Sequence, residues 1–565
     1  MTAARRGTRA LAVLALVVVC GLGTLAWLST SACGDAVPRR GSGEIGQCWF
    51  LPHEGAAVAW RRLARGTPPL AGRPDDFARE RPPGFSRPVP HVPLARHPFM
   101  AAGGSNMHSD ASMSDAHAAA GPVGLDPRVV TRTQGFGGYG TLAFDRGGRI
   151  VAVYSNGGGF QLELMDPDTL EELASWNLPA RPWYFPLQGV LPWKYIGAGM
   201  YFYLDERDRA VVPTTQNTVE VVQAPPVGSG DGFRRVRTYD LAEAVVPMRW
   251  PQRDSVAWVL PEWNGQRYWY ATLGGIVGTV EVESGAVRTL RLDGEIVENS
   301  FAVGEDGVFI VSDRALYRFA AGDAGEPVVR WRAPYDRGPA AKPGHLTRGS
   351  GSSVTLAGGP AGLVVITDNA EPRIHVEFFR RADGARVCRV PVFPPGQSGT
   401  DLSPIAFEHT DEHGAGSGRY SSIVENNWGH HAFPRPRPVP GLTRVDARRE
   451  ADGSFTCATV WESREKSLGI PKLSLGSGLV YVYGPDDVPD ATGWSFTAID
   501  FATGETVFRR RAGIGHGFNN WQGALFLHPA NGAAYTTTIF GLAMLRDTEG
   551  GMPDRADDGP RRARQ

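Results

Sequence analysis

The hydrophobic pattern of this chain repeats about eight times between Gly140 and Asp547. Each copy has a short apolar strand, a turn rich in Gly and Asp, and a second apolar strand that ends in polar residues. Short strands at a spacing of roughly 40–55 residues bury their faces only against neighbouring copies. The pattern therefore predicts an all-β protein that folds as a single β-propeller. The copies are centred on Thr141–Asn156, Met200–Thr218, Val256–Gly275, Phe301–Asp313, Val354–Asn369, Pro404–Asn427, Pro471–Gly484 and Ala524–Thr538.

The number of blades and the closure of the ring follow from the same pattern. We predict about eight four-stranded blades, and about seven is the alternative because the second and sixth copies are irregular. The last copy, Gly517–Asp547, is one strand short, whereas Val129–Gln134 has a strand pattern of its own before the first copy. We therefore predict that Val129–Gln134 completes the last blade, and that the propeller spans residues 129–547.

The first 33 residues form a signal or membrane anchor. Arg5, Arg6 and Arg9 precede an apolar stretch at 10–28, as in the charged and hydrophobic regions of an export signal. The stretch is also just long enough to cross a bilayer as a helix, and Ser29–Cys33 fits a permissive lipoprotein-processing pattern. A retained anchor, a cleaved signal and a lipoprotein all place the propeller outside the cytoplasm. We expect it at the cell membrane, single-pass or lipid-anchored.

The cysteines agree with export. Cys20 lies in the apolar stretch, which leaves Cys33, Cys48, Cys388 and Cys457, an even number for an oxidising compartment. Cys388 and Cys457 occupy matching positions in the last strands of consecutive copies, so we expect a disulfide between neighbouring blades. A second bridge between Cys33 and Cys48 would close a short loop, and free thiols are the alternative for both pairs.

Composition limits the remaining segments and the classes of partner. Residues 34–128 are rich in Pro, Arg, Ala and Gly and lack strand or helix periodicity, which favours a linker or arm. Residues 548–565 are charged and poor in apolar side chains, and we expect them to be disordered. The 71 Gly and 44 Pro suit a fold with many turns. The net charge of −1 gives no reason to expect nucleic acid.

The outer strands of the copies carry a recurring phrase, an apolar strand, an Asp, a turn, a Glu and a second apolar strand. It is clearest in Phe496–Arg509 (FTAIDFATGETVFR) and Leu164–Trp176, and weaker in Thr279–Leu290. These segments resemble repeats of the quinoprotein-like propeller superfamily, in which the Asp and a Thr-Gly turn close the outer hairpin. The resemblance implies the fold. The dehydrogenases of that superfamily have adjacent cysteines near the quinone, whereas this chain has none.

Polar residues follow the second strands and precede the first strands of the copies. In a propeller, both sets of residues meet around one mouth of the central channel, which makes that mouth a candidate ligand site. Turn chemistry is the alternative for each residue alone, because Asn, Asp and Ser often bond their own backbone in turns. The candidate ligand-binding residues are Asp313, Lys342, Asp368, Asn369, Glu425, Asn426, Lys472, His516, Asn519, Asn520 and Trp521.

Two further hypotheses concern metal and acid–base chemistry. Asp368, Asn369, Glu425 and Asn426 come from adjacent blades and offer the oxygen ligands that Ca²⁺ prefers, which makes calcium a candidate cofactor. In the arm, His108 is a further ligand-binding candidate. It could bind a metal together with His117, or act as an acid or base oriented by Asp110, in a segment that folds over the mouth as a lid. A plain linker is the alternative.

The sequence as a whole predicts an exported, membrane-tethered propeller that acts as a binding or scaffold module of the cell envelope. Its partners would be the membrane, through the N-terminal helix, and a small molecule, a glycan or an envelope protein at the mouth. The alternative is an enzyme at the same mouth, either a metal-assisted hydrolase or lactonase, or a quinoprotein-like oxidoreductase. No nucleophile elbow, phosphate-binding loop or dinucleotide fingerprint occurs in the sequence.

Overall fold

The computed structural model describes most of the chain after residue 40. The described residues are 41–44, 50, 52–65, 77–103, 107–108, 110–134, 137–155, 159–180, 199–245, 254–343, 345, 347–430, 437–488, 491–539 and 541–548. The predicted signal or anchor, Cys33, Cys48 and nearly all of the tail lie outside these ranges.

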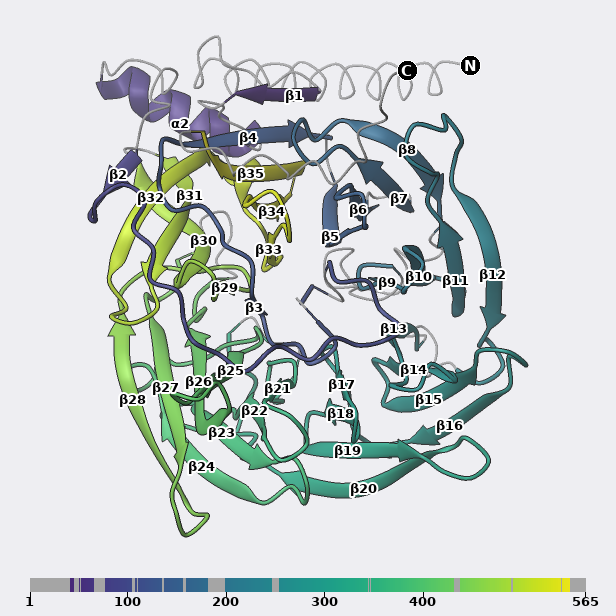
Figure 1. Cartoon of the computed structure of the whole chain (residues 1–565). Helices are drawn as coiled ribbons and strands as arrows, with labels where there is room; N and C mark the ends of the chain where they lie inside the picture. The colour runs from purple at the N-terminus through teal and green to yellow at the C-terminus, as the bar shows by residue number, and fades with distance from the viewer. Residues whose placement is uncertain are drawn as a thin grey trace, which may run out of the picture.

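Eight antiparallel sheets form a closed ring, which confirms the predicted propeller of eight four-stranded blades (Figure 1). From the channel outward, blade 1 is β5 (Gly138–Phe144), β6 (Ile150–Ser155), β7 (Phe160–Met165) and β8 (Glu172–Asn177). Blade 2 is β9 (Tyr203–Leu204), β10 (Arg209–Pro213), β11 (Thr218–Gln223) and β12 (Arg234–Asp240). Blade 3 is β13 (Val256–Pro261), β14 (Arg267–Thr272), β15 (Ile276–Glu281) and β16 (Val287–Arg291).

The ring continues with four blades of the same construction. Blade 4 is β17 (Ala302–Gly304), β18 (Gly307–Val311), β19 (Ala315–Ala321) and β20 (Pro327–Pro334). Blade 5 is β21 (Thr355–Ala357), β22 (Leu363–Thr367), β23 (His375–Arg380) and β24 (Arg386–Pro391). Blade 6 is β25 (Ile405–Thr410), β26 (Gly416–Glu425), β27 (Leu442–Arg449) and β28 (Phe455–Ser463). Blade 7 is β29 (Lys472–Ser474), β30 (Leu479–Val488), β31 (Ala491–Asp500) and β32 (Thr506–Ile514).

Blade 8 combines strands from the two ends of the described chain. It contains β33 (Leu525–Leu527), β34 (Ala534–Thr538), β35 (Gly541–Asp547) and β4 (Pro127–Thr133). β4 pairs antiparallel with β35, from Gly541 opposite Thr133 to Asp547 opposite Pro127. A short strand, β1 (Gly41–Glu44), pairs with the other edge of β4.

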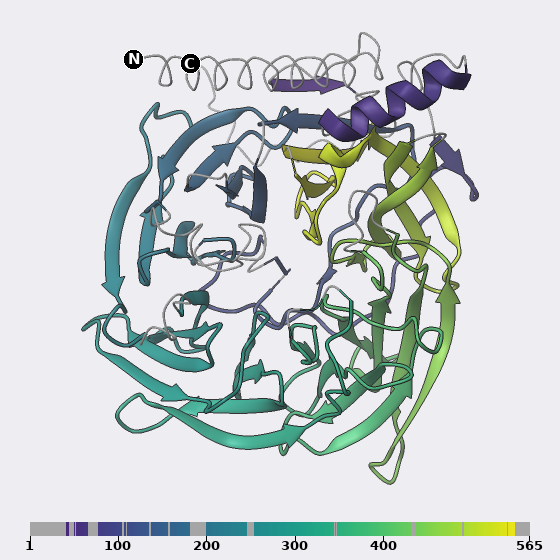
Figure 2. The same ribbon diagram turned by 180° about the vertical axis from the view of Figure 1, so that it is seen from behind.

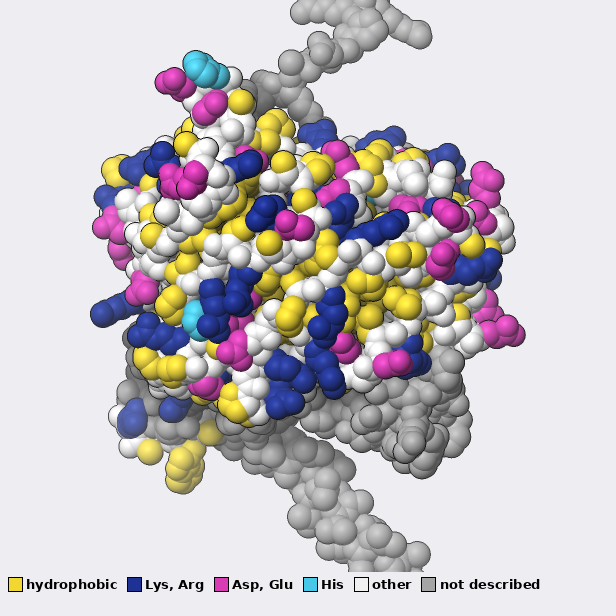
Figure 3. Space-filling model, turned by 90° about the horizontal axis from the view of Figure 1, so that it is seen from below, with side chains coloured by type: hydrophobic (Ala, Val, Ile, Leu, Met, Phe, Trp, Pro, Cys, Tyr) yellow, Lys and Arg dark blue, Asp and Glu magenta, His cyan; other side chains and the backbone are white. Residues whose placement is uncertain are grey.

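The position of each strand within its blade explains the sequence pattern. The second strand is covered on both sides by neighbouring blades, so nearly every residue of β6 and β22 is buried. The outermost strand has only one covered face, and β8 and β24 accordingly alternate between exposed and less exposed positions. Figure 3 shows the resulting outer wall from below, where basic, acidic and apolar side chains are interspersed.

The outer hairpins have the turn that the sequence phrase implied. Between β31 and β32, the Asp500 carboxylate accepts hydrogen bonds from the backbone N–H of Ala502 (2.9 Å) and from Thr503 Oγ1 (3.1 Å). Gly504 follows with a φ of 76°, a conformation that suits glycine. The Asp and the Gly thus fix the turn, and the strands pack around it.

The arm is more ordered than the sequence indicated. Its prediction as a linker without regular structure was wrong for α2 (Pro52–Arg65), β2 (Phe77–Arg79) and β3 (Ala116–His117). The signals for α2 were present, because Pro52 begins the helix, Glu54 lies in its first turn and Arg65 ends it. β2 extends blade 7 at its outer edge, and β3 extends the same sheet at its inner edge.

Between β2 and β3 the arm crosses one face of the ring and then enters the channel. In Figure 1 it passes in front of the blades, whereas in Figure 2 it lies behind them. Hydrogen bonds hold it along the way: the N–H of Val89 donates to Leu475 O, that of Val92 to Glu408 O and that of Ala101 to Leu204 O. We call this covered face the arm face and the opposite one the mouth face.

Candidate functional site

Within the channel, the arm lies along the inner strands of four consecutive blades. The second residue of each inner strand donates its N–H to an arm carbonyl, at 2.8–3.0 Å. The prediction that this segment folds over the mouth as a lid is therefore wrong. The segment instead forms part of the channel wall. The donor and acceptor pairs are Val303 with Ala111, Leu356 with Ser112, Ala406 with Ser114 and Leu473 with Asp115.

The arm is held in a backbone conformation that its own sequence disfavours. Met107, Met113 and Asp115 have φ values of 72°, 56° and 53°, in the left-handed region that side chains with a Cβ rarely adopt. Such residues persist only where surrounding contacts hold them. The hydrogen bonds from the inner strands supply those contacts, so the arm is a built part of the channel.

Four buried polar side chains lock the arm to blades 6 and 7, and we call them the arm node: His108, Asp115, Ser403 and Lys472. Asp115 is central, because its carboxylate accepts from Ser403 Oγ (2.6 Å), from His108 Nδ1 (2.9 Å) and from Lys472 Nζ. Lys472 Nζ also donates to Met107 O (2.8 Å). Asp115 is thus the partner of His108. The predicted orienter, Asp110, instead accepts from Ser114 Oγ (2.6 Å).

Asp115 and Lys472 of the arm node form a buried ion pair contact inside the protein. Burial alone would raise the pKa of Asp115, but His108 and Lys472 outweigh burial and lower the pKa of that carboxyl. Burial lowers the pKa of Lys472, opposed by the charge of Asp115. Because Ser403 and His108 both approach Asp115, and Ser403 contacts the same His108 nitrogen, this is not the relay of a catalytic triad.

Glu425 is the most unusual group beside the arm node. In the pairing of β25 with β26, Ile405 lies opposite Ile423. Two residues beyond this pair, the same register brings Glu425 next to Ser403. Glu425 is 1% exposed, and both of its carboxyl oxygens lack a hydrogen-bond partner among the described residues. Burial, together with Asp401 and Asp115, raises its pKa well above the ordinary value.

Asp401 is the hub of a second polar group at the mouth face, which we call the mouth cluster. The segment 398–404 before β25 positions Asp401, and the segment after β26 positions Asn427 and His430. Asp401 accepts from Asn427 Nδ2 and from Gln522 Nε2, which arrives from blade 8. His430 Nδ1 lies 2.7 Å from Asn427 O and donates to it, so its Nε2 accepts from Gln522. The cluster comprises Asp401, Tyr201, Glu298, His345, Glu425, Asn427, His430 and Gln522.

The charge of Asp401 shifts the pKa of groups from several blades. It helps to raise the pKa of Tyr201 from blade 2 and that of Glu298 from blade 4, both of which are raised mainly by burial. Burial lowers the pKa of His345 to about 4 against the opposing effect of Asp401, so this imidazole is neutral. Both nitrogens of His345 are buried without a hydrogen-bond partner in the described part of the chain.

The raised pKa of Glu298 gives a pH-dependent prediction. Burial raises it from 4.5 to about 7, so the folded state keeps a proton that the unfolded chain releases. This contribution to stability is fully present below about pH 4.5 and is lost as the pH rises through about 7. We expect Glu298→Gln to remove it, so that between about pH 5 and 8 the Tm of the variant rises relative to wild type. Glu412→Gln, at an exposed hairpin, is the control. A parallel Tm profile for E298Q and wild type would contradict the assignment.

The predicted calcium residues are engaged in two separate places. Asp368 accepts from the ring of His375 (2.9 Å) and from Arg389 Nη2 (2.7 Å) within blade 5. Asn369 Nδ2 donates to two backbone carbonyls at 2.9 Å. Among the described residues, no hydrogen bond or ion pair joins them to Glu425 or Asn426. Nor does this part of the chain contain three His, Cys, Asp or Glu side chains grouped to hold a metal ion. Calcium at this site stays a prediction.

Several other predicted residues lie around the rim with contacts of their own. Asp313 pairs with Arg337 and accepts from the N–H of Ile296 (2.8 Å). Lys342 pairs with Glu371 and donates to Ala370 O (3.0 Å). Asn426 Nδ2 donates to Gln397 O (2.8 Å). These contacts fix loops between neighbouring strands.

The loop before blade 8 divides into two parts. The backbone N–H of His516 donates to the Glu54 carboxylate of α2 (3.1 Å). The side-chain oxygen of Asn519 accepts from the N–H of Trp521 (2.8 Å). Asn520 Nδ2 donates to Gly523 O (3.1 Å), whereas its Oδ1 is buried without a partner among the described residues. Trp521 is 41% exposed. Trp521 and Gln522 have φ values of 47° and 64°, and this turn directs Gln522 to Asp401.

Asp401, His345, Gln522 and Asp115 were not among the site residues predicted from the sequence. Asp401 and His345 lie within the polar segments that precede first strands, and Gln522 follows another such segment directly. These residues could therefore have been found from their position in or beside a polar segment before a first strand, and not from their residue type. Asp115 lies in the arm segment that also contains His108 and His117, and only the course of the arm brings it to Lys472.

No helix in the described residues is both long and apolar enough to cross a membrane. Comparison with protein-family models and with curated proteins gives no match. Among solved structures, the chain is similar to a protein of unknown function from Desulfotomaculum acetoxidans, with 13% identity over 65% of this chain and 96% of that one and a TM-score of 0.34.

Two further solved structures show the same kind of likeness. The β-propeller domain of Cps50 (Swd1) from Myceliophteria thermophila shares 10% identity over 61% of this chain and 94% of its own, with a TM-score of 0.35. BamB from Moraxella catarrhalis shares 13% identity over 61% of this chain and 93% of its own, with a TM-score of 0.31. These likenesses concern the fold alone. The eight-bladed ring confirms the fold that the resemblance to quinoprotein-like propellers implied.

Proposed function

We propose that this protein is an exported propeller, tethered to the cell membrane through residues 1–33, that acts as a binding or scaffold module of the cell envelope. Its ligand site is the mouth cluster. The observation that carries the proposal is the convergence on Asp401 of polar groups from blades 2, 4, 5, 6 and 8. Polar groups that converge at one end of a channel are typical of a ligand site.

The chemistry of the cluster indicates what the ligand supplies. Glu425 and Asp401 present carboxyl oxygens, and both oxygens of Glu425 lack partners among the described residues. Leaving such atoms buried and unpaired costs about 1–3 kcal/mol each. A ligand with several hydroxyl or amine donors satisfies them. Trp521, partly exposed beside Gln522, adds a flat surface on which a sugar ring stacks. A glycan of the cell envelope therefore fits best.

Two observations support an extracytoplasmic location. The charged and apolar regions at the N-terminus have the order of an export signal. Cys388 and Cys457 form a disulfide, a bond that persists in oxidising compartments. Fractionation of cells that express the full chain tests this part directly. We expect the protein to sediment with membranes and to be degraded by protease added from outside the cytoplasm.

Binding at the mouth is tested with soluble glycans of the cell envelope and three proteins: wild type, Asp401→Asn and Asp487→Asn. The first substitution removes the charge of the hub with little change of shape. The second removes a fully exposed charge elsewhere on blade 7. We expect D401N to weaken glycan binding by about tenfold or more, because charge-assisted hydrogen bonds are lost, and D487N to bind as wild type. Equal binding by wild type and D401N in calorimetry would reject the mouth cluster as the site.

A further inference from the structure

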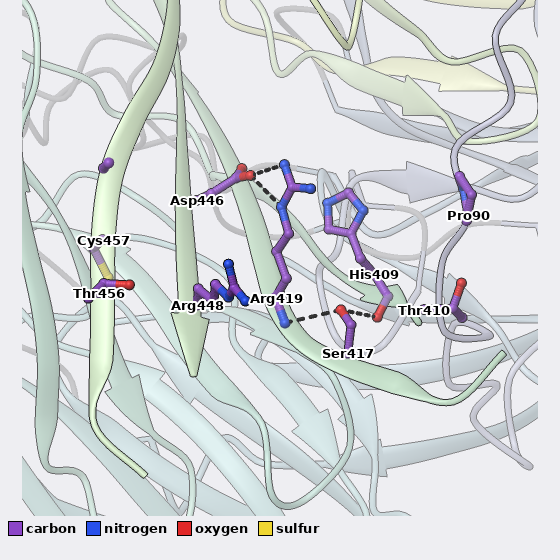
Figure 4. Close-up of a pocket in the computed structure, with 10 residues that line it drawn as sticks. Pro90, His409, Thr410, Ser417, Arg419, Asp446, Arg448, Thr456 and Cys457 are labelled. Carbon is purple, nitrogen blue, oxygen red and sulfur yellow. Dashed lines mark hydrogen bonds and ion pairs between the residues drawn. The ribbon is translucent and has the colours of Figure 1, made fainter. Parts of the chain in front are cut away.

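A pocket of about 650 Å³ lies on the arm face of blade 6, away from the mouth cluster (Figure 4). We call it the blade 6 pocket. Pro90 of the arm forms one wall, and hydrogen bonds from Val89 to blade 7 and from Val92 to blade 6 fix that wall in place. The opposite wall is the outermost strand β28. The residues that line the pocket are Pro90, His409, Thr410, Ser417, Arg419, Asp446, Arg448, Thr456, Cys457 and Ala458.

The strands of blade 6 bring two guanidinium groups into this pocket. Arg419 of β26 lies directly opposite Arg448 of β27, and Arg448 lies opposite Thr456 of β28. Residues opposite one another in a sheet share a face, so the three side chains line one surface, as Figure 4 shows. Two like charges in this position repel each other, and a bound anion offsets that cost.

The only carboxylate that lines the pocket, Asp446, is already paired with arginines. Asp446 accepts from Arg419 Nε (2.8 Å) and from Arg444 Nε and Nη2 (2.9 Å each). Ser421 Oγ also donates to it (2.7 Å), and these contacts lower the pKa of Asp446 despite its burial. Asp446 thus remains an anion shared by two arginines. The charge of Arg448 is not compensated by any acidic partner in the described part of the chain.

Apart from Asp446, no residue that lines the pocket is acidic. Burial lowers the pKa of His409 to about 4, with Arg419 contributing, so this imidazole is neutral and bonds Ser421 Oγ at 2.7 Å. Glu450, which does not line the pocket, accepts from Thr456 Oγ1 (2.6 Å). His91 of the arm lies close enough to act electrostatically on His409. The lining itself carries Arg419 and Arg448 against Asp446, which leaves the pocket with a net positive charge.

We propose that the blade 6 pocket binds a phosphoryl group, held by Arg448 and Arg419, with the hydroxyl of Thr410 at its edge. Arginine presents paired N–H donors that match the oxygens of such an anion. The phosphoryl group comes either from a free phosphate compound or from a lipid headgroup. The pocket lies on a different face from the mouth cluster, so the proposal does not depend on the glycan assignment.

Calorimetric titration of the full chain with inorganic phosphate at low ionic strength tests the proposal. Arg448→Gln is the test variant, because the Arg448 side chain is exposed and has no hydrogen bond or ion pair among the described residues. Arg449→Gln is the matched control on the same strand, where Arg449 faces Tyr420 on the other side of the sheet. We expect R448Q to weaken phosphate binding by about tenfold or more, and R449Q to bind as wild type.

Sedimentation with vesicles distinguishes the source of the phosphoryl group. The comparison uses phosphatidylcholine vesicles with and without phosphatidic acid, and the same three proteins. Binding that needs phosphatidic acid and Arg448, without binding of free phosphate, assigns a lipid headgroup. Binding of free phosphate alone assigns a soluble phosphate compound. The proposal is overturned if wild type binds neither probe up to about 10 mM phosphate, or if R448Q and R449Q weaken binding equally.

Discussion

Lys472→Met is expected to lower the free energy of unfolding by about 3–5 kcal/mol, the cost of leaving one charge of a buried pair without its partner. Lys472 and Asp115 are both buried, and Asp115 would keep only His108 and Ser403 as partners. Met107 O also loses its donor, Lys472 Nζ, which adds to the effect. Chemical denaturation measures it, and protease cleavage within 107–117 reports whether the arm leaves the channel.

Two further proteins make this result specific. Lys466→Met removes a lysine whose partner, Asp487, is fully exposed, so we expect a change within about 1 kcal/mol. The double variant K472M/D115N removes both charges and keeps the left-handed backbone at residue 115, which Asn tolerates. It should recover part of the stability lost in K472M. If K472M were as stable as K466M, the arm node would not hold the arm.

The same pair gives a direction for acid stability. The partners of Asp115 hold its pKa below the usual range, so its contribution to stability is present at neutral pH and is lost as the pH falls through that lowered pKa. The arm is expected to detach in acid before the blades unfold.

The fold could be predicted because each blade repeats the same burial. The second strands are covered on both faces, so segments such as Leu363–Thr367 are continuously apolar and are recognised without knowledge of their neighbours. Position within a repeat also predicted the disulfide, since Cys388 and Cys457 are aligned in adjacent outer strands. Local pattern and tertiary contact agree in both cases.

The arm and the site depend on contacts that leave no local trace. The polar composition of residues 107–117 is that of a linker. The hydrogen bonds that order this segment come from strands roughly 190 or more positions later in the chain, for example from Val303 to Ala111. Asp401 sits in a segment that reads as an ordinary turn, and only ring closure brings Gln522 to it. Asp368 is the opposite case. It follows a second strand, as a site residue was predicted to do, but its carboxylate binds Arg389 within the same blade.

The disulfide between blades 5 and 6 should have the second large effect on stability. It joins Cys388 of β24 to Cys457 of β28, with Cα atoms 6.2 Å apart and a sequence separation of 69. A crosslink over a loop of this size restricts the unfolded chain strongly, and native disulfides contribute about 2–4 kcal/mol. We expect C388A/C457A to lose about that much free energy of unfolding. Alanine fits the buried site of Cys388 without adding a polar atom.

Reductant provides the matched comparison, because it breaks the same bond without changing the sequence. Dithiothreitol should lower the Tm of wild type toward that of C388A/C457A, and it should change the double variant little. A response that remains in the variant reports a bridge between Cys33 and Cys48. Since Cys457 also lines the blade 6 pocket, phosphate binding by the double variant adds a second readout. Stability equal to wild type under oxidising conditions would show that packing between β24 and β28 holds the two blades together without the crosslink.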